Sequence, residues 1–146
     1  MSELADINVL LVDDEVSFVE TLTKRLSKRN LSIGQAFSGN EGLDYLSNNS
    51  NVEVIILDVK MPGMDGIETL KHIKKKYPLL EVIMLTGHAT VESAIEGMRL
   101  GAFDYLMKPC DIDQLISKVK DAASKKRQHE EKIVQARIKE ITNRQA

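Results

Sequence analysis

The chain has 146 residues, 42% of them hydrophobic and 29% charged, which suits one globular domain with its own core and argues against a second full domain. Its apolar runs fall far short of the roughly 18 residues that a membrane-spanning helix needs, and its acidic start is unlike a signal peptide. We therefore expect a cytoplasmic protein without a membrane segment. Its single cysteine, Cys110, cannot form an internal disulfide, which agrees with a reducing compartment.

Strands and helices are predicted to alternate five times. Five short apolar runs predict strands, and the segment after each has apolar residues at helical spacing. In chain order, the runs and the stripes that follow them are 7–12 with Val16, Val19, Leu22 and Leu26; 31–37 with Leu43 and Leu46; 52–57 with Ile67, Leu70 and Ile73; 80–86 with Ala94, Ile95 and Met98; and 103–107 with Ile112, Leu115, Ile116 and Val119. Because the runs are continuously apolar, we expect a parallel sheet covered on both faces, a doubly wound α/β fold.

Capping residues mark where four of the helices begin. Ser38 or Asn40 precedes the second helix, Asp65 the third and Thr90 the fourth, while the fifth begins near Asp111.

The end of the chain differs from the rest in charge. Residues 124–146 carry seven Lys or Arg and three Glu, a net charge of +4, so the remainder carries −6. This tail lacks Gly and Pro and is predicted to prolong the fifth helix. Val134, Ile138 and Ile141 form a narrow apolar stripe in it, but residues 125–131 interrupt any heptad. Either a solvated helix end or a partner-dependent coiled coil fits this pattern.

Polar side chains follow four of the five predicted strands. In doubly wound sheets, ligands bind at the carboxyl ends of the strands. Singly, these residues have ordinary explanations, as helix caps, turn residues or surface groups. It is less plausible that four strands end by chance on groups that all suit the same chemistry. The residues are Asp13, Asp14 and Glu15 after the first strand, Asp58 after the third, Thr86 at the end of the fourth, and Lys108 with Pro109 after the fifth.

Together these groups indicate phosphoryl transfer. Clustered carboxylates repel one another unless one is protonated or a cation neutralises them. Oxygen ligands without His or Cys favour Mg²⁺. A lysine and a hydroxyl can both bind phosphoryl oxygens. One aspartate can then act as the nucleophile toward phosphorus while the cations disperse charge.

Four motifs, LLVDDE, VIILDVKMPGMDG, VIMLTGHA and GAFDYLMKP, stand in an order and spacing that closely resemble the receiver domain of two-component response regulators. The resemblance covers residues 7 to about 122. It implies a flavodoxin-like (βα)5 fold with strand order 2-1-3-4-5 and a cis Lys108–Pro109 peptide. We accordingly divide the chain into a receiver domain, residues 1–122, and a basic helical extension or linker, residues 123–146.

The resemblance also implies the chemistry of the acidic residues. Asp58 would accept a phosphoryl group from the phosphohistidine of a histidine kinase or phosphotransfer protein. Asp14 and Asp58 would bind Mg²⁺ directly, with Mn²⁺ able to replace it. Asp13 would act mainly through water, and the Lys60 backbone carbonyl would complete the protein ligands.

Three further residues are implied to act in a switch. Thr86 and Lys108 would bind the phosphoryl oxygens. Tyr105 matches the aromatic switch position, so its ring would turn inward and reshape the face made by the fourth helix, fifth strand and fifth helix. An aromatic residue half-buried on an edge strand is the alternative interpretation of Tyr105.

Two residues near the site suggest control of the phosphoryl lifetime. Lys60 and His88 each lie two residues beyond a site residue, where they would flank the path of hydrolytic water. We hypothesise that they tune the lifetime of the aspartyl phosphate; solvated loop side chains are the alternative. Nothing in the sequence suggests a role for His72 or His129.

The leading function is a phosphorylation-controlled switch rather than a metabolic enzyme. One alternative is a Mg²⁺-dependent phosphohydrolase with an aspartyl nucleophile, but its DxD arrangement is absent because Asp13 and Asp14 are adjacent. Another is DNA binding through the basic tail, which has no helix-turn-helix partner and is diluted by glutamates.

The TGHA loop and the helical tail are similar to receivers of the nitrogen-regulation type, which precede an ATPase and a DNA-binding domain. We therefore expect either a single-domain regulator that acts through protein partners or, as this similarity favours, a receiver with a missing output domain and a link to transcription regulation. We also expect a homodimer through the switch face or the C-terminal helix. We expect neither membrane binding nor direct nucleic-acid binding by these residues.

Overall fold

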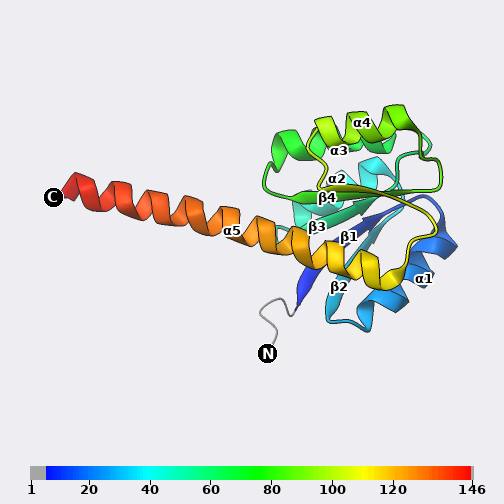
Figure 1. Ribbon diagram of the computed structural model, residues 1–146, viewed down its shortest axis with the longest axis horizontal. Coiled ribbons are helices and arrows are strands. Elements are labelled where there is room, and N and C mark those ends of the chain that lie inside the picture. Colours follow the sequence, from blue (N-terminus) through cyan, green and yellow to red (C-terminus); the bar gives the residue numbers. More distant parts are fainter. Residues whose placement is uncertain (1–5, 146) are drawn as a thin grey trace.

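The computed structural model describes residues 6–145; residues 1–5 of the predicted domain and residue 146 lie outside the described residues. A five-stranded sheet lies between two helical layers, and the last helix projects far beyond it (Figure 1). The elements are β1 (Ile7–Val12), α1 (Val16–Ser27), β2 (Leu31–Ala36), α2 (Gly39–Asn48), β3 (Val54–Leu57), α3 (Gly66–Lys76), β4 (Glu81–Thr86), α4 (Val91–Arg99), β5 (Asp104–Met107) and α5 (Ile112–Gln145).

All strand pairs are parallel, in the order β2-β1-β3-β4-β5, which confirms the predicted fold and strand order. Helices α1 and α5 pack on one face, and α2, α3 and α4 cover the other. The register pairs Val12 with Leu57 and Leu57 with Met84. The residues that follow β1 and β3 therefore emerge side by side at the carboxyl edge of the sheet.

Burial explains why the strand sequences are continuously apolar. Every residue of β3 and of β4 is buried. In β1, alternate residues contribute to different cores: Val9 and Leu11 face α1 and α5, whereas Leu10 and Val12 face the other helical layer. A strand with helices on both faces has no solvent side on which polar residues are favoured.

The predicted helix starts are confirmed by their capping bonds. Ser38, not Asn40, caps α2 by accepting a hydrogen bond from the Glu41 N–H, and Asp65 caps α3 through the Glu68 N–H. Thr90 and Ser93 form a reciprocal capping box at the start of α4. These bonds satisfy backbone donors that the first helical turn leaves without partners.

Three residues of the predicted apolar stripes lie largely outside the core, although the helices that the stripes predicted are present. Val16 is 50% exposed because α1 begins beyond the carboxyl edge of the sheet, and in α4 Ile95 and Met98 are 51% and 46% exposed. Gly97 is the buried residue of α4, and a side chain there would contact Met84 and Tyr105. Since α4 touches the sheet through a glycine, its larger apolar residues are displaced toward solvent.

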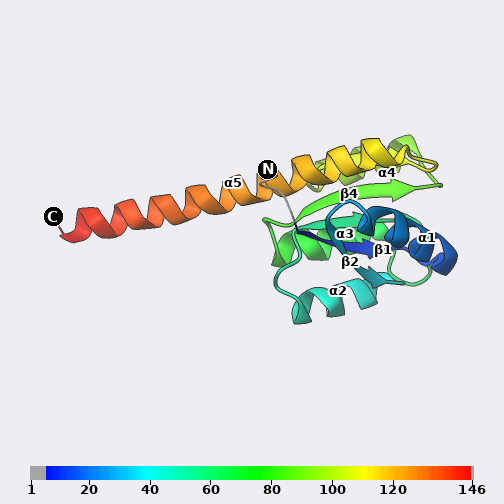
Figure 2. The same ribbon diagram turned by 90° about the horizontal axis from the view of Figure 1, so that it is seen from below.

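The prediction that the tail prolongs the fifth helix is confirmed. Figures 1 and 2 show α5 crossing one face of the sheet and continuing alone beyond it. The stripe of Val134, Ile138 and Ile141 on this free part is more than half exposed. No helix within residues 6–145 is both long enough and apolar enough to cross a membrane.

An ion pair joins α5 to the amino end of the sheet where the helix leaves the domain. Arg127 donates through Nε to Glu53 Oε2 at 2.6 Å and through a second nitrogen to Glu53 Oε1 at 2.9 Å. Lys125 lies 3.6 Å from the buried Glu81. A two-pronged arginine–carboxylate pair is geometrically specific and stronger than a single surface contact.

Replacing Arg127 by Met is expected to loosen α5 near residues 124–131 while leaving the sheet intact. The two side chains are 33% and 13% exposed, so we expect a loss of about 1–2 kcal/mol, between surface and buried pairs. Amide hydrogen exchange measured by mass spectrometry should become about tenfold faster in this segment. Arg144→Met, which loses only a bond to Glu140 in the same helix, is the matched control. Equal exchange in the two variants would contradict the prediction.

Candidate functional site

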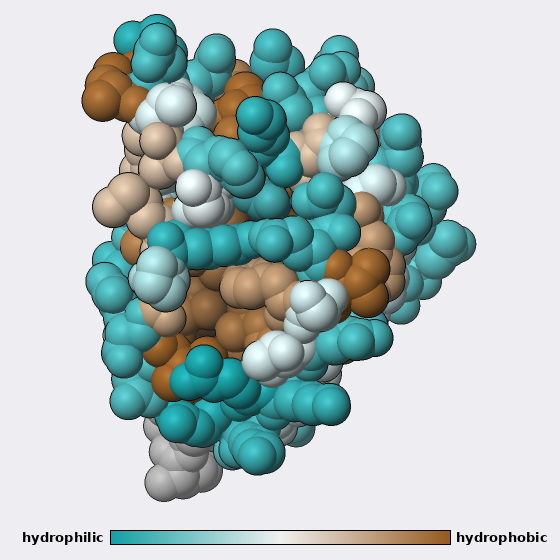
Figure 3. Space-filling model, turned by 90° about the vertical axis from the view of Figure 1, so that its right-hand side faces the viewer, coloured by the Kyte–Doolittle hydropathy of each residue, from teal (hydrophilic) through white to brown (hydrophobic). Residues whose placement is uncertain are grey.

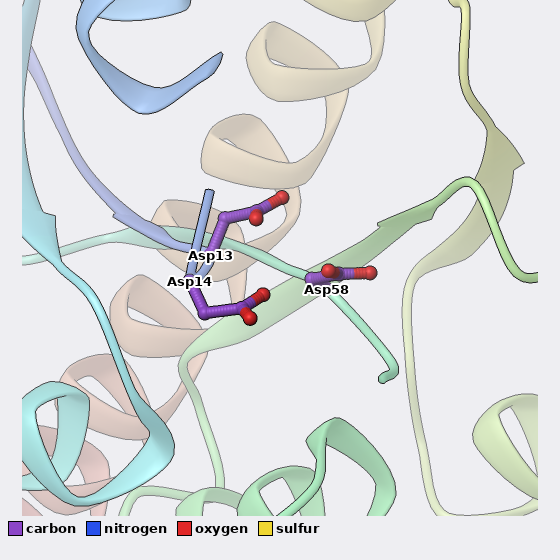
Figure 4. A group of neighbouring side chains, drawn as sticks. All are labelled: Asp13, Asp14 and Asp58. Atoms are coloured by element: carbon purple, nitrogen blue, oxygen red, sulfur yellow. The ribbon is translucent and has the colours of Figure 1, made fainter. Parts of the chain in front are cut away.

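Three carboxylates converge at the carboxyl edge of the sheet, as the residues that follow the predicted strands indicated. Asp13 and Asp14 follow β1, Asp58 follows β3, and Figure 4 shows their side chains beside one another. One oxygen from each lies within 4.8 Å of the others. Asp13 and Asp58 are 1% and 3% exposed, and Asp14 is the most open of the three.

Burial raises the pKa of Asp13, and the charge of Asp58 acts in the same direction. Hydrogen bonds from Lys108 and from the Glu15 N–H oppose that rise. Asp58 Oδ1 also accepts the Val59 N–H at 2.8 Å. Three carboxylates this close together, which offer only hard oxygen donors, suit a divalent cation such as Mg²⁺.

Lys108 supplies the positive charge of the site. Its Nζ donates to Asp13 Oδ2 at 2.7 Å and to Glu15 Oε1 at 2.9 Å, and it lies 3.9 Å from the centroid of the Phe18 ring. Burial acts to lower the pKa of Lys108, but the bonds to Asp13 and Glu15 outweigh it and leave that pKa above its usual value. The Lys108–Pro109 peptide is cis.

Thr86 and Tyr105 each have a hydrogen-bond partner in or after the β4–α4 loop. Thr86 is fully buried, and its hydroxyl accepts the His88 N–H at 3.0 Å. The Lys108 N–H donates to the Thr86 carbonyl, so the ends of β4 and β5 lie together. The half-buried Tyr105 has its hydroxyl 2.5 Å from Ser93 Oγ in the first turn of α4.

The side chains of Lys60 and His88 are exposed at the rim of the acidic cluster. Together with Asp14 and Asp58 they line an open hollow. Figure 3 faces this end of the molecule and shows hydrophilic side chains around a hollow with an apolar floor. His72 is elsewhere, in a groove between α3 and α4.

Gly66 permits the close approach of α3 to the loop of Asp58. A Cβ at Gly66 would lie 1.9 Å from the Asp58 carbonyl oxygen, and the Gly66 N–H donates to the Val59 carbonyl at 2.6 Å. Only a residue without a side chain fits here, which fixes where the chain runs after Asp58.

Residues 9–120 match the family model of the response regulator receiver domain. The chain belongs to this family. The receiver is 42% identical over 114 residues to the DNA-binding transcriptional regulator NtrC of Klebsiella pneumoniae, covering 78% of this chain and 24% of NtrC. The chain thus spans about a quarter of the length of the curated relatives that it matches.

Solved receiver structures agree with this assignment. A receiver domain protein from Clostridium thermocellum has a TM-score of 0.79 at 34% identity, covering 83% of this chain and 97% of that one. NtrX from Brucella abortus has a TM-score of 0.80 at 30% identity, and the match covers 86% of this chain and 29% of NtrX. The chain is thus a receiver of two-component signalling, a phosphoacceptor rather than a catalytic enzyme, which disfavours the phosphohydrolase alternative.

Membership also clarifies the metal and the partner. The triad of Asp13, Asp14 and Asp58 is typical of the Mg²⁺ site of receivers, and a receiver implies a histidine kinase as partner.

The sequence did not predict three contacts of the site. Glu15 was visible in the acidic run but was given no role, and nothing in the sequence pointed to Phe18 or Ser93. The Phe18–Lys108 and Ser93–Tyr105 contacts join different elements, so no local pattern of residues could have indicated them.

Proposed function

We propose that Asp58 accepts a phosphoryl group from the phosphohistidine of a histidine kinase or phosphotransfer protein. A carboxylate oxygen of Asp58 attacks phosphorus, the P–N bond breaks, and its electron pair leaves with the imidazole. The observation that carries this proposal is the position of Asp58, held at a strand end beside Asp14 and beside Asp13, which binds the Lys108 ammonium. A fixed nucleophile reacts faster because little orientational freedom is lost in the transition state.

The carboxylates of Asp14 and Asp58 and the carbonyl of Lys60 are our proposed direct ligands of Mg²⁺ or Mn²⁺, with Asp13 acting through water. A bound divalent cation would neutralise charge on the phosphoryl oxygens. Lys108 provides a second positive charge for the same oxygens. The oxygen-only donor set and the raised pKa of Asp13 support this assignment.

The proposed switch starts at Thr86. Its hydroxyl leaves the His88 N–H and binds a phosphoryl oxygen, and Tyr105 changes orientation, so the α4-β5-α5 face is reshaped. Exposed apolar side chains support this face as a docking surface for a partner or a second copy: Val91, Ile95, Met98 and Met107. The free part of α5 is the other candidate for a homodimer contact.

We further propose that residues 1–122 form the receiver and that residues 123–146 link it to an output domain. The support is the match to NtrC, which is named a DNA-binding transcriptional regulator. Transcription regulation would then be the output, and the receiver itself would not contact DNA.

The experiment that tests this function uses the whole chain with a small phosphodonor and Mg²⁺. We expect the mass to increase by one phosphoryl group only when Mg²⁺ is present. Asp14→Asn should abolish both this gain and the rise in thermal unfolding midpoint that Mg²⁺ causes in the wild type. Uptake that is independent of Mg²⁺ and of Asp14 would contradict the proposal.

The same assay, continued after removal of the donor, tests the lifetime hypothesis. A double variant, Lys60→Ala with His88→Ala, should lose its phosphoryl group at a different rate from the wild type, because both side chains line the hollow beside Asp58. Identical decay would show that these are merely solvated loop residues.

A further inference from the structure

The ammonium of Lys108 has three partners in the β1–α1 loop and the first turn of α1. Asp13 follows β1, Glu15 precedes α1, and Phe18 lies in the first turn of α1. An ammonium has three N–H donors and no acceptor. Two of these donors are used by carboxylates, and the Phe18 ring offers the electron-rich face that attracts a cation at this distance.

The three partners differ in how easily Lys108 can leave them. The side chain of Asp13 is 2% exposed, whereas that of Glu15 is 63% exposed. A contact to a solvated carboxylate contributes little and is readily replaced. Phe18 is half-buried and packs against the core that α1 and α5 share, so its ring is held in place. Glu15 is therefore the exchangeable partner.

An anion arriving at Asp58 competes with Glu15 for the same ammonium. Lys108 has a long, flexible side chain, and holding it in one place carries a large entropy cost. Its own exposure of 14% shows that it is enclosed before any anion binds. Asp13 and the Phe18 ring can retain the ammonium while the third partner changes.

We propose that Phe18 is a positioning residue that keeps the Lys108 ammonium beside Asp58 while Lys108 exchanges Glu15 for a phosphoryl oxygen. This inference rests on the proposed function, because it assigns a residue to the same phosphoryl transfer. Phe18 does not touch the reacting atoms; it acts through Lys108.

The competing explanation is that Phe18 merely fills space in the core. Leucine retains apolar volume but has no aromatic face, whereas tyrosine retains the face. Comparing Phe18→Leu with Phe18→Tyr therefore separates the two explanations, and thermal unfolding of both variants reports any loss of packing.

The test follows phosphorylation of the whole chain by a small phosphodonor with Mg²⁺ at varied donor concentrations. Phe18→Leu is expected to lower the maximal rate about 3- to 10-fold, the range of a partly desolvated cation–ring contact. The donor concentration for half-maximal rate should stay unchanged, and Phe18→Tyr should restore the rate. Glu15→Gln should tighten binding of beryllofluoride, a mimic of the phosphoryl group, because Lys108 no longer has to give up its bond to the Glu15 carboxylate.

Several outcomes would overturn the inference: an unchanged rate in Phe18→Leu, equal losses in the leucine and tyrosine variants, losses that only follow the unfolding midpoint, or beryllofluoride binding that Glu15→Gln does not tighten. A wild type that takes up no phosphoryl group would instead overturn the proposed function, and the exchange at Lys108 with it. The wild-type arm thus distinguishes the two failures.

Discussion

Asp58→Asn is expected to abolish phosphoryl transfer entirely while preserving the fold. The amide has nearly the shape of the carboxylate but lacks the charged oxygen that attacks phosphorus. Asp58 is buried at the end of β3, and its Oδ1 accepts the Val59 N–H, a bond that the amide oxygen of asparagine can also accept. Intact-protein mass after incubation with a phosphohistidine donor and Mg²⁺ measures the result.

Asp44→Asn is the matched control for this variant. It removes the same charge from an exposed position on α2, away from the site, and should be phosphorylated like the wild type.

Removing one of three repelling charges should also make Asp58→Asn slightly more stable than the wild type without Mg²⁺. A phosphoryl group found on the Asp58→Asn chain would show that another residue accepts it and would refute the assignment.

Gly66→Ala is expected to damage both the fold and the site. Its Cβ would lie 1.9 Å from the Asp58 carbonyl oxygen, a backbone atom that cannot move without displacing β3 or α3. Overpacking usually costs 1–3 kcal/mol, and we expect about 3 kcal/mol here because the obstacle is backbone. Urea unfolding measures this loss, and phosphorylation should fall by about 100-fold if Asp58 shifts by roughly 1 Å.

Gly97→Ala provides the control, since it adds the same methyl group to a helix. A Cβ at Gly97 would make only ordinary contacts, at 3.7 Å from Met84 and Tyr105. Because alanine favours a helix over glycine by about 1 kcal/mol, this variant should be as stable as the wild type or more stable. If Gly66→Ala were also neutral, the close approach of α3 to Asp58 would not constrain the site.

Most of the fold was predictable because the central strands β1, β3 and β4 are covered on both faces and four of the helix starts have a local signal. The strand runs and the caps at Ser38, Asp65 and Thr90 depend on short-range chemistry that the sequence displays directly. The apolar spacing in α4 correctly predicted a helix but not the exposure of its residues, because spacing shows which residues share a face, not what that face contacts. The glycine at position 97, which turns Ile95 and Met98 toward solvent, acts through tertiary packing.

The candidate site was predictable to the same extent. Parallel strands end at one edge, so the meeting of Asp13, Asp14 and Asp58 follows from the strand order. The bonds of Lys108 to Glu15 and of Arg127 to Glu53 could not be predicted from the strand order, because a long side chain can reach several possible partners. Packing alone decides which partner is chosen.

The path of α5 gives the molecule a mechanical property. The helix begins just after Lys108 and Pro109, crosses the domain, and is fastened by Arg127 at the opposite end. From Arg127 to Gln145 the helix extends for roughly 27 Å at 1.5 Å per residue. Each degree of tilt about Arg127 would therefore move the tip by about 0.5 Å. A rigid α5 that pivoted at Arg127 would have two arms of similar length, about 23 Å toward Ile112 and about 27 Å toward Gln145, so a displacement at its start would reach the tip at nearly full size.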